Sequence, residues 1–92
     1  MRVEWDDAKD RTNRAKHGLS FETACLVFDD PLHVSVQDRF EEGEVRWQTI
    51  GVVAGVVLIV AHTYVEAKEE IIRIISARRA TTRERARYEE GE

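Results

Sequence analysis

The spacing of apolar residues changes partway along this chain of 92 residues. Between residues 20 and 31, apolar positions recur every three or four residues, which is the spacing of a buried helix face. After Leu32 the period becomes two, as expected for half-buried strands. This pattern predicts strands at residues 33–37, 44–53, 56–65 and 70–77. Turn residues at positions 41–43, 54–55 and 66–69 connect them, so consecutive antiparallel hairpins are expected.

Helix-capping residues define the remaining elements. Asp6 precedes a predicted helix over residues 7–17 that ends at Gly18, and Ser20 precedes a second, short helix. Thr81 and Glu84 form the capping-box pattern that opens a C-terminal helix. Residues 3–5 are a short candidate strand. The predicted fold is therefore α+β, with a small antiparallel β-sheet, two N-terminal helices and one C-terminal helix in a single domain over residues 1–92.

The charge distribution singles out the C-terminal end. Residues 73–88 hold six arginines and one acid, Glu84, whereas the whole chain carries a net charge of −4. Every cation in this stretch is arginine, whose planar guanidinium matches pairs of phosphate oxygens. A basic end on an acidic body predicts binding to a polyanion.

Composition and motifs limit the alternatives. The only cysteine, Cys25, cannot form an internal disulfide, and three scattered histidines have no metal-ligand spacing. No phosphate-binding loop, dinucleotide fingerprint or nucleophile elbow is present. The longest apolar run, residues 52–61, is too short to cross a bilayer, and no secretory signal is found, so a cytoplasmic protein is expected. An enzyme of this kind would use neither a metal nor a cofactor.

Strand pairing brings candidate chemistry together. A loop of residues 66–69 places His62 opposite Arg73, and the turn at 54–55 places Trp47 beside His62. The predicted row Trp47–His62–Arg73 holds an aromatic ring, a titratable base and a phosphate ligand on one face. A shift of one residue would move one strand's side chains to the other face, and His62 would then belong to the packing of the sheet.

Three further groups are candidates. Lys16 and His17 end the first helix, where His17 is either a proton carrier or a favourable charge at the helix terminus. Glu44 and Arg46 share a face of one strand and pair with each other or with a ligand. The arginines of the C-terminal segment form either an anion site or a solvated helix face; these are Arg78, Arg79, Arg83, Arg85 and Arg87.

Several segments resemble the BrnT family of ribonuclease toxins from bacterial type II toxin–antitoxin systems. The resemblance covers residues 3 to 88 and is most specific at Lys16-His17-Gly18-x-Ser20-Phe21 and at Arg73-Ile-Ile-Ser-Ala-Arg-Arg-Ala80. Further matching segments are Trp5-Asp6, Asn13, Phe28-Asp-Asp-Pro31, Glu44-x-Arg46, Ile50-Gly51 and Glu84-Arg85-x-x-Tyr88.

The resemblance implies a RelE-like fold, RNA cleavage that inhibits translation and growth, and neutralisation by a BrnA-type antitoxin. Such an antitoxin is usually a DNA-binding protein, so operator DNA would be contacted only through it, and no membrane is involved. With a metal-free ribonuclease in view, we assign phosphate binding to Arg73 and Arg78, and a supporting cationic role to Arg46. Proton transfer is assigned to His17 or His62, with Lys16 as an alternative proton carrier or phosphate contact. The expected RNA contacts are Lys16, Trp47, Arg79, Arg83 and Arg87.

A different class of function also fits these residues. A non-catalytic module with a basic docking face would bind a nucleic acid or an acidic protein without cleaving it. An RNA-cleavage assay in EDTA distinguishes the two functions.

Overall fold

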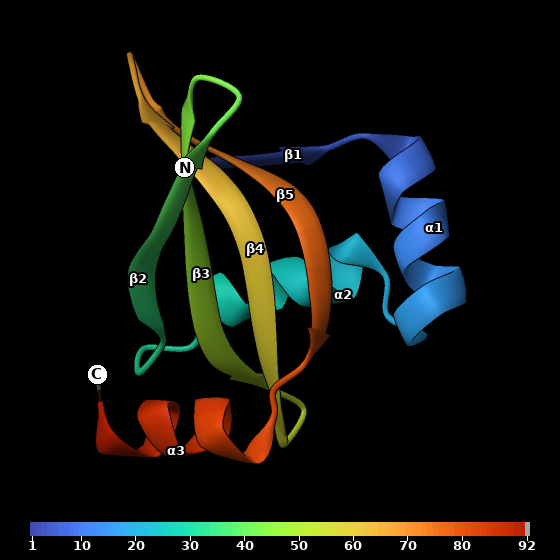
Figure 1. The fold of residues 1–92 in the computed structure, drawn as a ribbon, viewed down its shortest axis with the longest axis vertical. Helices are drawn as coiled ribbons and strands as arrows, with labels where there is room; N and C mark the ends of the chain where they lie inside the picture. Colours follow the sequence, from blue (N-terminus) through green and yellow to red (C-terminus); the bar gives the residue numbers. More distant parts are fainter. Residues whose placement is uncertain (92) are drawn as a thin grey trace.

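The computed structural model describes residues 1–91 and contains one five-stranded sheet with helices around it (Figure 1). The strands lie in the order β1–β5–β4–β3–β2. In chain order the elements are β1 (Arg2–Trp5), α1 (Asp7–His17), α2 (Phe21–Ala24), the 3-10 helix η1 (Cys25–Asp29), β2 (Val34–Glu41), β3 (Glu44–Val53), β4 (Val56–Glu66), β5 (Glu70–Arg79) and α3 (Thr82–Glu90).

The predicted α+β class is confirmed, and the sheet differs from the expectation in one strand. β2, β3, β4 and β5 pair antiparallel, whereas β1 pairs parallel with β5 at the edge of the sheet. A parallel pair needs a long connection, and here most of the chain lies between β1 and β5. The second predicted helix is also shorter than expected, because α2 gives way to η1 at Cys25.

Two-residue turns set the register of the first two hairpins. Glu42 and Gly43 connect β2 to β3, and Ala54 and Gly55 connect β3 to β4, all with positive φ. Paired positive φ angles match the right-handed twist of the flanking strands. The turn at Ala54-Gly55 pairs Trp47 with His62, as predicted from the sequence.

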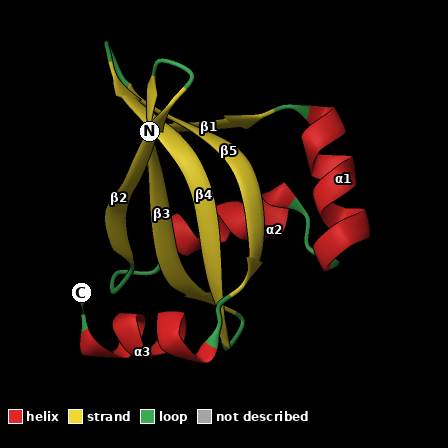
Figure 2. Ribbon diagram, in the orientation of Figure 1, coloured by secondary structure: helices red, strands yellow, loops and turns green. Residues whose placement is uncertain are grey.

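The core lies between the sheet and the helical segment α2–η1 (Figure 2). Phe21, Ala24 and Val27 are fully buried there. They pack against residues of β4 and β5, namely Leu58, Val60, Ile72, Ile74 and Ala77. Gly51 of β3 allows η1 to lie close to the sheet, because a Cβ at that position would lie 3.0 Å from the carbonyl oxygen of Val27.

Helix α1 extends the sheet edge beyond β1 through one buried side chain. The Asn13 amide nitrogen donates to the carbonyl oxygen of Ala77 at 2.8 Å, and the Ala77 N–H donates back to Asn13 at 3.1 Å. The side chain thus replaces a neighbouring strand where β1 has ended. Asp6 is the N-cap residue of α1 but forms no side-chain capping hydrogen bond, contrary to the expected role of its carboxylate.

Helix α3 is held mainly by polar contacts, since none of its nine residues, all described by the structure, is buried. At its first turn, Arg78 pairs with Glu84, and the predicted capping box with Thr81 is confirmed. At its last turn, the Tyr88 hydroxyl donates to the Asp30 carboxylate at 2.6 Å. The helix therefore lies across one end of the sheet face that α2 and η1 leave open (Figure 1).

Candidate functional site

Three arginines and a threonine form one row across the open face of the sheet. Arg39 of β2 pairs with Arg46 of β3, Arg46 with Thr63 of β4, and Thr63 with Arg73 of β5. Directly paired residues of neighbouring antiparallel strands project from the same face. We call Arg39, Arg46, Thr63 and Arg73 the arginine row.

Glu44 connects two members of the arginine row. Its Oε1 accepts a hydrogen bond from Arg73 Nη2 at 2.7 Å, and its Oε2 lies 3.8 Å from Arg46 Nε. Glu42 approaches the other end of the Arg46 guanidinium at 3.8 Å. Only 14% of the Arg46 side chain is exposed, and its Nε has no hydrogen-bond partner among the described residues. A buried donor without a partner is uncommon in folded proteins and singles out Arg46 among the residues of the arginine row.

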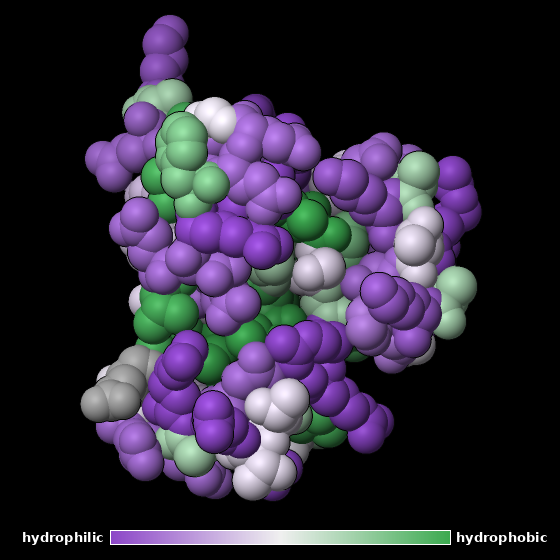
Figure 3. All heavy atoms as spheres, viewed as in Figure 1, coloured by the Kyte–Doolittle hydropathy of each residue, from purple (hydrophilic) through white to green (hydrophobic). Residues whose placement is uncertain are grey.

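These groups line a cavity of about 260 Å³ between the sheet, the β2–β3 turn and the start of α1. Its residues are Asp6, Lys9, Glu42, Glu44, Arg46, Arg73, Ile74 and Ile75. Figure 3 shows apolar residues at the floor of a hollow on the open face, with polar residues on both sides of it. The open face therefore offers both a charged cavity and an apolar surface beside it.

Arg78 lies on the same face, but its guanidinium is already engaged. Its two terminal nitrogens donate to the two carboxylate oxygens of Glu84 at 2.7 and 2.9 Å. The hydrogen bonds from Arg78 lower the pKa of Glu84 from 4.5 to about 2. Arg78 thus connects the first turn of α3 to β5, a structural role that differs from the predicted phosphate binding.

His62 lies on the opposite face from Arg73, so the predicted row Trp47–His62–Arg73 is wrong in its last member. Glu66 pairs with Glu70, which leaves a loop of residues 67–69 and places Arg73 opposite Thr63. That shift of one position exchanges the two faces of β5 relative to β4. Trp47 remains beside His62, away from the arginine row.

The surroundings of His62 are those of a core residue. Only 3% of it is exposed, its Nε2 lies 2.7 Å from Thr49 Oγ1, and its Nδ1 lies 2.9 Å from the Thr63 carbonyl oxygen. Because Nδ1 must donate to a carbonyl, Nε2 accepts from Thr49 in the neutral ring. Burial lowers the pKa of His62. Trp47 and His62 line an aromatic cavity of about 380 Å³ on the face covered by η1.

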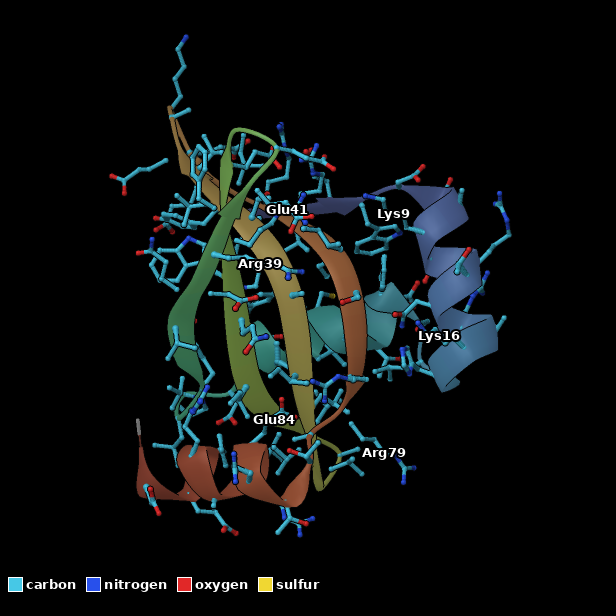
Figure 4. The ribbon with its side chains drawn as sticks, in the orientation of Figure 1. Lys9, Lys16, Arg39, Glu41, Arg79 and Glu84 are labelled. Atoms are coloured by element: carbon cyan, nitrogen blue, oxygen red, sulfur yellow. The ribbon has the colours of Figure 1, made fainter. Side chains whose placement is uncertain are left out.

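The predicted N-terminal candidates occupy a third location. His17 and Arg79 line a pocket of about 250 Å³ beside the β3–β4 turn, and His17 does not line the cavity at the arginine row. Lys16 is exposed on α1 (Figure 4). On α3, Arg83 is exposed, and Arg87 lines a pocket with Gln48 on the open face. The predicted RNA contacts are therefore spread over several surfaces.

Sequence reasoning missed Arg39 and Lys9. The predicted strand at residues 33–37 is too short, because β2 continues to Glu41 after a register irregularity at Asp38. Recognising that irregularity would have placed Arg39 opposite Arg46. Nothing in the sequence indicated Lys9, because only the packing of α1 brings it to the cavity.

Residues 1–91 contain no group of three histidine, cysteine, aspartate or glutamate side chains placed to hold a metal ion. Within the same range, no helix is long and apolar enough to cross a membrane.

Comparison with known proteins gives two consistent results. Residues 5–84 match the sequence model of a family described as ribonuclease toxin, BrnT, of type II toxin–antitoxin system. The crystal structure of the Brucella abortus ribonuclease toxin, BrnT, is similar to this one, with a TM-score of 0.64 and 32% sequence identity over 89% of this chain and 99% of that chain. The search of curated proteins gave no match.

Proposed function

The chain belongs to the BrnT family of ribonuclease toxins of type II toxin–antitoxin systems, and from this premise we propose that it cleaves RNA without a metal ion at the arginine row. Glu44 is the proposed general base, and Arg46 and Arg73 are the proposed phosphate ligands. The observation that carries this proposal is the position of Glu44 between the two arginines, within one cavity.

The reaction begins with the 2′-hydroxyl of the RNA. The Glu44 carboxylate takes its proton, and the 2′-oxygen attacks the adjacent phosphorus. Negative charge then accumulates on the non-bridging phosphate oxygens, where the guanidinium groups of Arg46 and Arg73 stabilise it. The requirement for a 2′-hydroxyl makes RNA rather than DNA the substrate.

The same arginines hold Glu44 before substrate arrives. Phosphate oxygens replace the carboxylate at Arg73 Nη2, the closest contact of Glu44 with the arginine row. The carboxylate released from this hydrogen bond is then free to accept the proton of the 2′-hydroxyl. Arg46 Nε is buried and has no hydrogen-bond partner among residues 1–91, so the protein's own acceptors do not satisfy the whole guanidinium of Arg46.

The other cations have supporting roles in this proposal. Arg78 holds α3 in place through Glu84, and Arg87 on α3 contacts a neighbouring phosphate of the RNA. Ile59 pairs with Arg78 and lies four residues from Thr63, so the arginine row and Arg78 are separated by about 13 Å along the strands. A single strand of RNA crossing the open face would follow this direction. In this proposal, Lys16, Arg79 and Arg83 contact phosphates farther along the RNA strand.

The family implies an antitoxin as the partner of this toxin. We propose a BrnA-type, DNA-binding antitoxin that covers the arginine row, so that operator DNA is contacted only through the antitoxin. Cleavage of cellular RNA and the resulting inhibition of translation and growth would take place in the cytoplasm.

The test is cleavage of a defined RNA by the purified protein in EDTA, with analysis of the product ends. The expected products are a 2′,3′-cyclic phosphate or a 3′-phosphate on one fragment and a 5′-hydroxyl on the other. An RNA with a 2′-deoxy nucleotide at the cleavage position is the matched control and should remain intact. Activity that disappears in EDTA and returns with magnesium would disprove metal independence, and binding without cleavage would favour a non-catalytic module.

A further inference from the structure

Cleavage at the arginine row requires a second proton transfer. When the phosphorus–oxygen bond breaks, the departing 5′-oxygen becomes an alkoxide, which is a poor leaving group unless it is protonated. We propose that Lys9 is the general acid that gives this proton to the 5′-oxygen. The inference rests on the proposed ribonuclease function and adds to it a catalytic residue.

The histidines and tyrosines of the chain do not line the cavity. His17 lies at the other end of α1, in a pocket with Arg79. His33 and His62 line the aromatic cavity on the opposite face of the sheet. Tyr64 donates to Glu70 in that region, and Tyr88 donates to Asp30. A proton donor must lie within hydrogen-bond reach of the reacting atom, directly or through one water.

The packing of α1 brings Lys9 to the cavity. It lies in the first turn of the helix and lines the cavity together with Glu44, Arg46 and Arg73. Figure 4 shows Lys9 on α1 at the end of the helix that joins β1. Lysine has a flexible four-carbon stem, so its ammonium group can take several positions within the cavity.

The charge environment also distinguishes Lys9 from its neighbours. Within residues 1–91, Lys9 forms no ion pair, whereas Arg46 and Arg73 are both paired with Glu44. Arginine is effectively always protonated in proteins and is a poor proton donor. Asp6, Glu42 and Glu44 also line the cavity, and as ionised carboxylates they accept protons rather than give them. Lys9 is therefore the cation of the cavity suited to proton transfer.

The complete step balances in protons and electrons. Glu44 receives the proton of the 2′-hydroxyl, the 2′-oxygen forms a bond to phosphorus, and the bond from phosphorus to the 5′-oxygen breaks. The Lys9 ammonium transfers one proton to that oxygen, which leaves as a 5′-hydroxyl. The protein then holds a neutral glutamic acid and a neutral amine, and proton exchange with water restores both.

A substrate with a different leaving group tests this role. In RNA with sulfur in place of the 5′-oxygen at the cleavage position, the leaving thiolate needs no proton. For Lys9→Met we expect a loss of about 10²–10⁴-fold in the cleavage rate of ordinary RNA. On the 5′-thio substrate, the same variant should cleave within a few-fold of the unmodified protein. Lys68→Met, at an exposed lysine outside the cavity, is the matched control and should cleave both substrates normally.

The outcomes separate this inference from the proposed function. Arg73→Ala should remain slow on both substrates, since it lowers charge stabilisation rather than protonation. If the unmodified protein cleaves ordinary RNA but Lys9→Met is equally slow on both substrates, Lys9 binds phosphate and is not the acid. If Lys9→Met cleaves ordinary RNA at the normal rate, the inference is wrong. If the unmodified protein cleaves neither substrate, the proposed function itself fails. Thermal unfolding of each variant shows whether it remains folded.

Discussion

Arg73 and Arg78 project from the same face of the sheet although five positions separate them along β5. In a regular strand, residues five positions apart point to opposite faces. Here His62 pairs with Ile74 and Ala61 pairs with Ser76, so Ile75 is an extra residue in β5. This bulge adds one position and returns Arg78 to the face of the arginine row. Arg73 and Arg78, which lie at different levels of the open face, therefore both come from β5.

Replacement of Arg73 tests the phosphate site directly. Arg73→Ala should lower kcat/KM for RNA by about 10²–10³-fold, because a charged donor to the transition state is lost. Arg73→Lys should recover only part of this loss, since lysine lacks the two-pronged geometry. Arg73 is half exposed, so the unfolding free energy should change little. Arg11→Ala, at an exposed arginine on α1, is the control. Full activity of Arg73→Ala would show that Arg73 does not bind the reacting phosphate.

Replacement of Glu44 tests the base. Glu44→Gln keeps the size of the side chain and its hydrogen bond to Arg73 but cannot accept a proton from the 2′-hydroxyl. We expect the cleavage rate to fall by about 10²–10⁴-fold while RNA affinity is unchanged or increased. Single-turnover cleavage and RNA binding should be measured separately. A variant that cleaves at the normal rate would show that another residue is the base.

The Arg78–Glu84 pair predicts acid-sensitive stability. The pKa of Glu84 is lowered from 4.5 to about 2 in the folded protein, so the pair stabilises the fold above pH 4.5 and loses this effect as the pH falls towards 2. At pH 7 we expect Glu84→Gln to lower the unfolding free energy by about 1–2 kcal/mol, since solvent at Arg78 screens the pair. Urea unfolding at several pH values measures this. Glu89→Gln, on the exposed side of α3, should have no comparable effect, and a difference that persists at pH 2 would contradict the prediction.

His62 is predicted to contribute to stability rather than to proton transfer. His62→Ala would remove hydrogen bonds to Thr49 and to the Thr63 carbonyl and leave a cavity, at a cost of about 2–4 kcal/mol. Its pKa is lowered by burial, so stability should decrease as the pH falls below 6.5 towards the folded pKa. Denaturant unfolding of His62→Gln and the original protein at pH 7.5 and 5.5 tests this. Loss of cleavage by a fully folded His62→Gln variant would instead restore the catalytic hypothesis.

The antitoxin is predicted to compete with RNA. If its acidic or apolar side chains occupy the arginine row, a non-cleavable RNA should weaken antitoxin binding, and the reverse should hold equally. Attraction between opposite charges also predicts an association rate that falls with salt, because the Debye length shrinks from about 10 Å at 0.1 M to about 3 Å at 1 M. Binding kinetics at several salt concentrations, with and without RNA, provide the measurement. Simultaneous binding without mutual weakening would place the inhibitory contact elsewhere.

Local signals in the sequence predicted much of the fold correctly. The capping box at Thr81 and Glu84 depends on residues three positions apart, and the structure confirms it. The turn at Ala54-Gly55 is two residues long, so its conformation determines the pairing of Trp47 with His62. These features follow from neighbouring residues, which is why the sequence by itself determined the element order, the α+β class and the family resemblance.

The composition of the cavity was decided only by the tertiary structure. The loop before β5 is one residue shorter than expected, so Arg73 and His62 lie on opposite faces, and Ile75 is an extra residue within β5, so Arg78 shares the face of Arg73. Lys9 and Glu44 are far apart in the sequence and meet because α1 packs beside β5. Register and helix packing depend on the fit of the whole core, and residues 66–70 contain no turn pattern that selects one register over its neighbour. The sequence by itself therefore determined which residues could do the chemistry, whereas folding decided which of them lie together.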